Sequence, residues 1–283
     1  MTAPSELAGS STVQTSAAQR ARPASQARER RVPDVVYSVA SVAVLLVVWT
    51  AVSHSSFVKP GYLPTPESLW TTFMELVRDG YQGNPLTEHI QVSLLRTLAG
   101  FLAGVLVGVP LGLCTGYNAR IGAMISPIMA FIRPIPPIAF IPMAVLYFGL
   151  GEVGKIVLIF FVSFNYVQAN AHAGAANFPI AYRRASESLG LTRWQTFVRI
   201  VLPGALPQIF TGLKTALALS WAVVVAAELV GAQSGLGFMI SDAAMLFRIP
   251  VVFIGIGLIG AIGLAMNLTL NWLEARIVHW KGR

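Results

Sequence analysis

The sequence predicts an all-α, polytopic membrane protein with about six transmembrane helices. Of its 283 residues, 55% are hydrophobic and only 11% are charged. Soluble domains carry about 25% charged residues. The deficit of charge, together with a mean hydropathy of +0.66, therefore indicates an integral membrane protein. Apolar runs that are long enough to cross a bilayer also recur along the chain.

A helix needs about 20 mostly apolar residues to span the hydrocarbon core of a membrane. Stretches of this kind are separated by shorter polar or glycine-containing segments, which we interpret as loops. The predicted spans are about 35–53, 93–116, 126–148, 153–175, 205–230 and 251–273.

Basic residues are distributed unevenly between the two sides that these spans define. If the N-terminus is cytoplasmic, thirteen of the 20 lysines and arginines lie inside, four lie outside and three fall within spans. Cytoplasmic loops are enriched in Lys and Arg, so we expect both termini in the cytoplasm. This orientation explains the net charge of +8 without a nucleic-acid partner.

Residues 1–33 differ from the rest of the chain, because they are rich in Ser, Ala, Gln and Arg. Such a segment cannot bury enough apolar surface to offset its ordering entropy, so we predict a disordered cytoplasmic tail. Residues 34–283 form the predicted transmembrane domain. The single cysteine, Cys114, excludes an intrachain disulfide.

The stretch FGLGEVGKIVLIF, 148–160, fits the phosphate-binding pattern G-x-x-x-x-G-K-[ST] up to its last position. There, Ile156 replaces the hydroxyl side chain that would bind Mg²⁺. The predicted orientation also places this loop on the outer face, where ATP is not available. We therefore expect a tight turn between two helices, with Glu152 and Lys155 at the water interface, and no nucleotide cofactor.

Two further stretches predict structure rather than chemistry. In the outer segment 54–92, Pro66 and Ser68 precede an amphipathic run, which predicts a short helix on the outer surface. The second span carries a glycine at every fourth position, and such a ridge lets a neighbouring helix approach closely. These glycines are Gly100, Gly104, Gly108, Gly112 and Gly116.

The third span contains FIRPIPPIAFIP. Proline lacks a backbone N–H and clashes with the preceding turn, so this helix must be distorted. Broken backbone at membrane depth occurs only where protein or a water-filled cavity satisfies it. The prolines concerned are Pro134, Pro136, Pro137 and Pro142.

Four polar residues within spans are candidates for a translocation pathway. Arg133 stands at the proline break, where it lines a pathway, caps carbonyls freed by the prolines or lies near the inner interface. Glu228, near the outer end of the fifth span, forms part of an outer gate or pairs with a neighbouring helix. Asn165 and His172 line a pathway or hydrogen-bond across helices.

The longest cytoplasmic loop, about 178–204, is polar, basic and prone to form helices. A first helix is predicted to end at Gly190. A second is predicted to begin at Thr192, which is a good N-cap with Gln195 three residues later, and to stop by Pro203. A rigid element of this kind, presented to the cytosol, predicts a docking site for a soluble partner.

This loop resembles the EAA loop of ABC-importer permease subunits, whose pattern is E-A-A-x-x-x-G-x₉-I-x-L-P. Two positions depart from the pattern, because Arg184 stands where the glutamate is expected and Ser186 where the second alanine is. Glu187 lies nearby but is displaced. The positions that match in register are Ala185, Gly190, Ile200, Leu202 and Pro203.

The resemblance extends over about residues 35–275 and is to the nitrate/taurine/alkanesulfonate branch of these permeases. It implies a type I ABC-importer permease fold in the bacterial cytoplasmic membrane. The implied partners are cytoplasmic ATP-binding subunits that hydrolyse ATP, an extracytoplasmic solute-binding protein and a second permease copy. The implied solute is a small oxyanion such as a sulfonate, taurine or nitrate, and the chain itself is not an enzyme.

Two other function classes remain as alternatives. An ion-coupled secondary transporter would use intramembrane carboxylates or broken helices, which Glu228 and the third span could supply. The EAA-like loop argues against it, because a secondary transporter has no ATPase to dock. An intramembrane enzyme is disfavoured because the sequence has no H-E-x-x-H or G-x-S-x-G pattern and its four histidines are scattered.

Overall fold

A computed structural model describes residues 34–55 and 61–280. Helices dominate these ranges, and the only extended pairing within them is one antiparallel bridge between Tyr81 and Asn84. Helix α1 (Asp34–Ser53) belongs mainly to one compact unit, and the residues from Val52 onward form a second. The predicted tail, 1–33, lies outside the described ranges.

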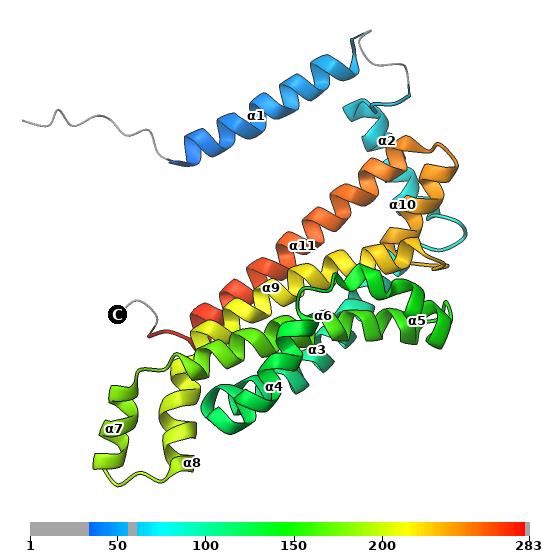
Figure 1. Ribbon diagram of the computed structural model, residues 1–283. Helices are drawn as coiled ribbons and strands as arrows, with labels where there is room; N and C mark the ends of the chain where they lie inside the picture. Colours follow the sequence, from blue (N-terminus) through cyan, green and yellow to red (C-terminus); the bar gives the residue numbers. More distant parts are fainter. Residues whose placement is uncertain (1–33, 56–60, 281–283) are drawn as a thin grey trace, which may run out of the picture. The chain divides into compact units, whose positions relative to one another are not determined.

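The second unit is a bundle of long helices with short elements at both ends (Figure 1). Helices α7 and α8 lie at one end and α2 and α10 at the other, and we call these the α7/α8 end and the α2/α10 end. The elements are α2 (Pro66–Asp79), α3 (Leu86–Tyr117), α4 (Ala119–Ile132), the 3-10 turn η1 (Pro137–Phe140), α5 (Ile141–Phe148), α6 (Glu152–Ala176), α7 (Ile180–Ser188), α8 (Arg193–Thr196), the π-helical segment η2 (Phe197–Val201), α9 (Leu202–Leu229), α10 (Leu236–Met245) and α11 (Ile249–Ile277).

Four helical stretches of the described chain are long and apolar enough to cross a membrane: α3, α6, α11 and the run from α8 through α9. A bent pair, α4 with η1 and α5, makes a fifth if it counts as one span. The predicted span 35–53 is helical, but its apolar part, Val39–Ser53, is shorter than these. The all-α membrane fold is thus confirmed, with four or five helices of spanning length where we predicted about six.

The glycine ridge packs α3 directly against α6, as its spacing predicts. A Cβ atom placed on Gly112 would lie 2.5 Å from the carbonyl oxygen of Gln168 and 2.6 Å from the Cβ of Ala171. A Cβ atom placed on Gly104 would lie equally close to α6, at 2.4 Å from the Cβ of Ser163. The backbones of the two helices therefore meet without intervening side chains.

Replacement of Gly112 by alanine should destabilise the protein by about 1–3 kcal/mol, because the added methyl group meets backbone atoms that cannot move away. The matched control is Gly257→Ala on α11, where nothing lies within 4 Å of the added Cβ. Thermal unfolding of both variants in detergent checks this expectation. Equal melting temperatures for the two variants would show that the α3–α6 contact is looser than the structure indicates.

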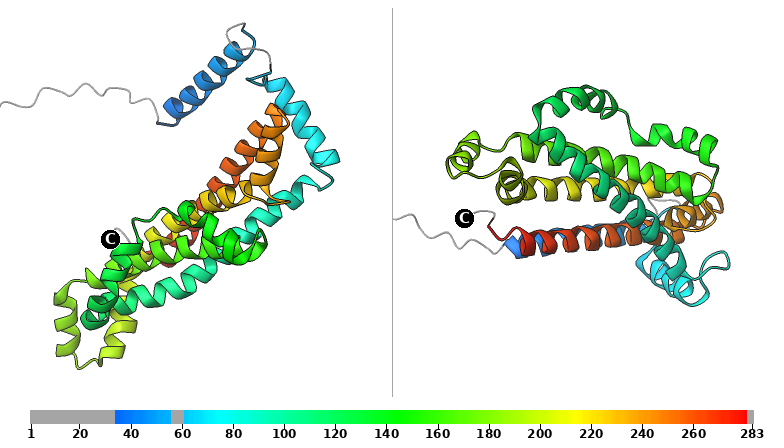
Figure 2. Two further views of the ribbon diagram at one scale, coloured as in Figure 1. Left: turned by 45° about the vertical axis from the view of Figure 1, so that its right-hand side comes forward. Right: turned by 90° about the horizontal axis from the view of Figure 1, so that it is seen from below.

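The prolines break the third predicted span, which confirms the expected distortion. α4 ends at Ile132, η1 and α5 follow from Pro137, and the two parts are bent by 83°. Figure 2 shows these short elements on one side of α6, with α11 on the far side of α9. Arg133 is exposed at the break, and its guanidinium makes no hydrogen bond or ion pair with any described residue, so this side chain does not cap the freed carbonyls.

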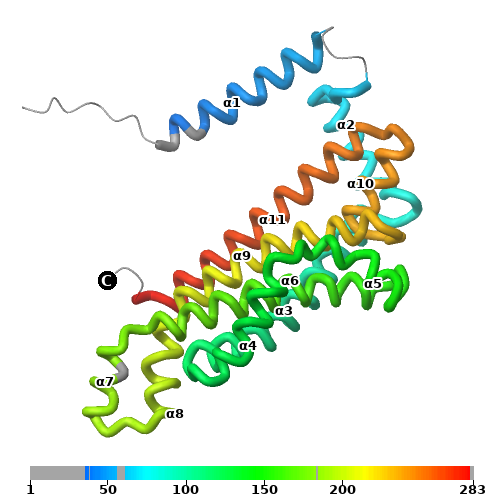
Figure 3. The backbone as a smooth tube through the Cα atoms, in the orientation of Figure 1, coloured from blue at the N-terminus to red at the C-terminus, as the bar shows by residue number. Residues whose placement is uncertain are grey.

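The prediction that a helix stops by Pro203 is wrong. One continuous helical run extends from Arg193 to Leu229, and Figure 3 shows the coils of α8 leading into those of α9. The π-helical turn of η2 makes this possible, because the N–H of Leu202 bonds to the carbonyl of Phe197, five residues back. Pro203 then lies in the first turn of α9, where its missing N–H costs little.

The predicted outer helix is α2. Thr65 caps it, with its side chain accepting a hydrogen bond from the N–H of Ser68, and Pro66 opens its first turn. Leu76 is buried against apolar residues of α10 and α11. This short helix therefore closes the α2/α10 end of the bundle.

Candidate functional site

The element formed by α7 and α8 is built around a tight glycine turn. The N–H of Leu191 donates to the carbonyl of Ser186, and the N–H of Gly190 donates to that of Glu187, both at 3.0 Å. This pair of bonds is a Schellman motif, and it places Gly190 at φ +74°. Gly190 ends α7 for a geometric reason, since side chains disfavour that conformation.

The start of α8 is fixed just as firmly, as predicted. Thr192 and Gln195 form a reciprocal capping box, with N–H to side-chain oxygen distances of 2.9 and 3.3 Å. The Thr196 hydroxyl donates to that of Ser186 at 3.1 Å, and both residues are buried. Ser186, at a departure from the family pattern, thus ties α7 to α8.

The element is also braced against the bundle. The Tyr117 hydroxyl at the end of α3 donates to the carbonyl of Arg193 at 3.0 Å. The rings of Tyr117 and Phe197 lie 5.1 Å apart, and Trp194 stacks on Phe197 at 5.8 Å. A force applied to this element would therefore be transmitted to α3 and, through η2, to α9.

Residues of the EAA-like pattern occupy two different parts of this element. Ala185, Glu187 and Gly190 are exposed on α7 and its turn. The I-x-L-P residues form the base of the element, where η2 joins α9, and they are partly buried: Ile200, Leu202 and Pro203.

A second polar site, at the opposite end of the bundle, centres on Arg96 of α3. Its guanidinium donates to the Glu228 carboxylate at 2.7 Å, to the Glu152 carboxylate at 2.6 Å and to the Ser234 carbonyl at 2.8 Å. Arg96 is 4% exposed and Glu228 1% exposed. One buried cation thus joins α3, the start of α6, the end of α9 and the loop before α10.

Glu228 has three kinds of partner, so its carboxylate is held in place. Besides Arg96, it accepts hydrogen bonds from the Ser93 hydroxyl at 2.8 Å and the Gly237 N–H at 2.9 Å. Gly235 leaves no room for a Cβ, which would lie 2.5 Å from this carboxylate. Of the two roles predicted for Glu228, the structure shows the pairing with a neighbouring helix.

Sequence reasoning missed Arg96, although a signal was present. His89, Ser93 and Arg96 recur at helical spacing, which places them on one face of α3. His89 accepts a hydrogen bond from the Gly235 N–H at 3.1 Å through Nδ1, and its Nε2 lies 3.2 Å from the carbonyl of Tyr81. A polar face on one span and a lone carboxylate on another indicate that the two helices meet.

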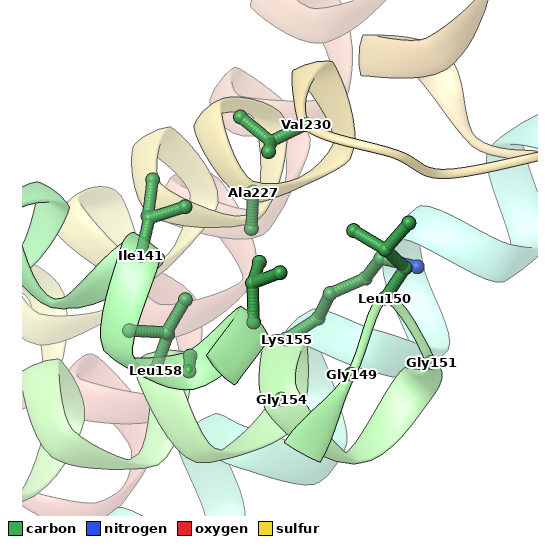
Figure 4. A pocket seen from close by; sticks show the side chains of 11 residues that line it. Ile141, Gly149, Leu150, Gly151, Gly154, Lys155, Leu158, Ala227 and Val230 are labelled. Carbon is green, nitrogen blue, oxygen red and sulfur yellow. The ribbon is translucent and has the colours of Figure 1, made fainter. Parts of the chain in front are cut away.

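The position of Lys155 differs from the predicted one, because its side chain is buried and does not lie at the water interface. It is 5% exposed, and its ammonium lies 3.3 Å from Glu152. Figure 4 shows its side chain beneath the Gly149–Gly151 loop, in a small pocket that Ile141 and Ala227 also line. The predicted tight turn is present, with Gly149 at φ +72°.

The elements at the α2/α10 end are joined by one further polar contact. The Tyr81 hydroxyl donates to the Asp242 carboxylate of α10 at 2.8 Å, and Gln82 donates to the same oxygen at 3.0 Å. Burial, together with the neighbouring Asp242, raises the pKa of Tyr81 to about 12. The phenol therefore stays protonated and continues to hold α10.

The four predicted pathway residues do not form one cluster. No hydrogen bond or ion pair among the described residues joins any two of them. His172 bonds across helices to Thr115 at 3.0 Å, and Asn165 is buried with its side-chain oxygen unpaired. Arg133 alone is exposed.

One exposed face of α9 differs in composition from the exposed faces of α3 and α11. The latter present large apolar side chains such as Leu106 and Leu264, which are 73% and 59% exposed. The α9 face has only small or polar side chains through five turns, and Gln208 bonds to Asn170 of α6 at 3.1 Å. Its exposed residues are Gly204, Gln208, Thr211, Thr215, Ala218 and Ala222.

Comparison with known proteins identifies a family. Residues 100–279 match the model of the binding-protein-dependent transport system inner membrane component. The chain is 36% identical to the taurine transport system permease protein TauC of Escherichia coli K12, over 88% of this chain and 90% of that protein. It is 30% identical to the putative aliphatic sulfonates transport permease protein SsuC of Bacillus subtilis 168, covering 84% and 85%.

Two further similarities extend the comparison. The bicarbonate transport system permease protein CmpB of Synechococcus elongatus is 29% identical, covering 88% of this chain and 92% of that protein. Among solved structures, a chain of the inward-facing MetNI methionine ABC transporter superposes with a TM-score of 0.59 at 21% identity. That superposition covers 70% of this chain and 96% of the other, and it shows the type I permease fold.

Proposed function

Because this chain belongs to the binding-protein-dependent transport inner-membrane components, the permease subunits of ABC importers, we propose that it imports a small oxyanion. The energy comes from ATP hydrolysed by a separate subunit. The chain is a multi-pass membrane permease and not an enzyme. The solute class is a sulfonate, taurine, nitrate or bicarbonate, and the membrane is the bacterial cytoplasmic membrane.

The observation that carries this proposal is the rigid α7–α8 element. Its Schellman turn, capping box and aromatic bracing give it a fixed shape, which suits a part that transmits force. ATP-binding subunits would dock here, around Gly190, so that their closure moves α3 and α9. On this proposal the α7/α8 end would face the cytoplasm, as would both chain termini.

The α9 face is the best candidate for the wall of the solute path. Lipid tails favour large apolar side chains, whereas small and hydroxyl side chains suit close helix contacts or a watery passage. Gln208, Thr211 and Thr215 would offer hydrogen bonds to a passing anion. A second permease copy would complete the passage, and homodimerisation would place a second α9 face opposite the first.

The solute class rests on the relatives and on one charge. The named relatives transport taurine, aliphatic sulfonates and bicarbonate. These solutes are small, and each carries an oxyanion group. Arg133 lies at a break in a helix pair of spanning length, and its exposed guanidinium has no partner among the described residues. A charged residue within a membrane span is costly and often marks an ion pathway, so Arg133 is compatible with an anionic solute.

The Arg96–Glu228 site at the α2/α10 end argues against the alternative function of a secondary transporter. A secondary transporter that coupled an ion through Glu228 would need this carboxylate free, but Glu228 is bonded to Arg96, Ser93 and Gly237. The α2/α10 end, which α2 closes, would face outward and receive an extracytoplasmic solute-binding protein.

Uptake into proteoliposomes tests the proposal. The chain is reconstituted with its ATP-binding subunit and binding protein, and uptake of labelled taurine is followed with and without ATP. We expect uptake that requires ATP and is inhibited by other sulfonates but not by a neutral solute of similar size. Uptake that needs only a Na⁺ or H⁺ gradient would refute the ABC-importer function.

A further inference from the structure

The exposed surface of the α7–α8 element combines large apolar side chains with positive charge. Tyr182, Leu189 and Trp194 are 59%, 78% and 71% exposed, although large apolar side chains are usually buried. Trp194 is held in position by stacking on Phe197. Ordered, exposed aromatic residues of this kind commonly anchor protein interfaces. We call this surface the docking surface.

The charge on this surface is mostly unpaired and positive. Arg184, Arg193 and Arg199 are exposed, and no ion pair of the described residues involves their guanidinium groups. Glu187 is the only acidic side chain on α7, α8 and η2. Arg184 also occupies the position at which the EAA pattern has a glutamate, so the sign of the charge is reversed there.

An exposed basic and aromatic surface has two possible classes of partner, a protein or a lipid membrane. The structure favours a protein. No atom lies within 4 Å of the position that a Cβ of Gly190 would occupy, so the partner can approach the backbone at the turn. The turn is also rigid, whereas attraction to lipid headgroups requires only charge and apolar area.

We propose that the docking surface fits a groove on the ATP-binding subunit whose floor is apolar and whose rim carries carboxylates, with Arg184 paired to one of them. Leu189 and Trp194 would fill the apolar floor. The proposal rests on the proposed function and adds to it the charge of the partner. It also predicts selectivity, because ATP-binding subunits with a basic rim would be repelled.

Charge reversal at Arg184 tests this inference. Purified chain in detergent is titrated with its ATP-binding subunit, and the dissociation constant is measured at low and high salt. Arg184→Glu should weaken binding by about tenfold or more, and Arg184→Gln should weaken it less. Native binding should weaken as salt rises, with a smaller salt effect for Arg184→Gln. The matched control, Arg78→Glu, makes the same charge change on exposed α2 and should bind normally.

The outcomes separate this inference from the function on which it rests. If the native chain binds the subunit and Arg184→Glu binds equally well, the acidic groove is refuted while docking stands. If the native chain does not bind the subunit at all, the proposed function fails as well. If Arg184→Glu affects only binding to vesicles of anionic lipid, the surface contacts the membrane and the inference is overturned.

Discussion

Replacement of Arg96 by methionine is expected to destabilise the protein by about 3–5 kcal/mol, because it leaves a buried carboxylate without its counter-charge. Glu228 is 1% exposed and would keep only Ser93 and the Gly237 N–H as partners. The same change would remove the hydrogen bonds that Glu152 and the Ser234 carbonyl accept from α3, while Lys155 would remain beside Glu152.

Two controls distinguish this effect from the loss of any arginine. Arg133→Met removes an exposed cation that has no partner among the described residues, so we expect a change of about 0.5 kcal/mol or less. The double variant Arg96→Met with Glu228→Met should be more stable than Arg96→Met alone, because no buried charge remains unpaired. Thermal unfolding in detergent measures all three. A loss from Arg96→Met no larger than that from Arg133→Met would contradict the network.

Replacement of Gly190 by tryptophan is expected to reduce ATP-driven uptake by at least about tenfold, as docked surfaces depend on a few well-packed contacts. The indole would occupy the open space beside the turn, where we place the ATP-binding subunit. The chain itself should still fold and insert, since a side chain at positive φ costs only about 1–2 kcal/mol.

Two matched variants separate bulk at the docking surface from strain in the turn. Gly190→Asn introduces a small side chain that tolerates positive φ, and it should keep most of the uptake. Gly83→Trp places the same bulk at a glycine with φ +82° and equally open surroundings, but at the α2/α10 end. ATP hydrolysis and uptake are measured for each. Uptake by Gly190→Trp equal to that of the native chain would show that the α7–α8 turn does not couple ATP hydrolysis to transport.

Much of the fold is predictable because its signals are local. Apolar runs predict the long helices, glycine spacing predicts the α3–α6 contact, and the pair Thr192 and Gln195 predicts the start of α8. These features depend on residues a few positions apart. The same is true of the proline break after Arg133, where the missing N–H groups act on neighbouring turns.

The features that sequence reasoning missed depend on residues far apart or on adjustment of the backbone. Arg96 and Glu228 are separated by 132 positions, so their ion pair forms only through the packing of α3 against α9, which local spacing does not determine. Lys155 follows a glycine turn, which suggests exposure, yet the loop and α9 cover it. Pro203 stops an ideal α-helix, but one wider π turn lets the helical run continue.

The most direct test of the proposed coupling is a cross-linking measurement on the assembled transporter. Leu189, at the tip of the docking surface, is changed to cysteine in a chain whose own exposed Cys114 is replaced by serine. A second chain carries the cysteine at Gly83 instead. A short cross-linker should join Leu189→Cys, but not Gly83→Cys, to the ATP-binding subunit. Cross-linking of Leu189→Cys to the solute-binding protein, or to neither partner, would contradict a cytoplasmic docking role for the α7–α8 element.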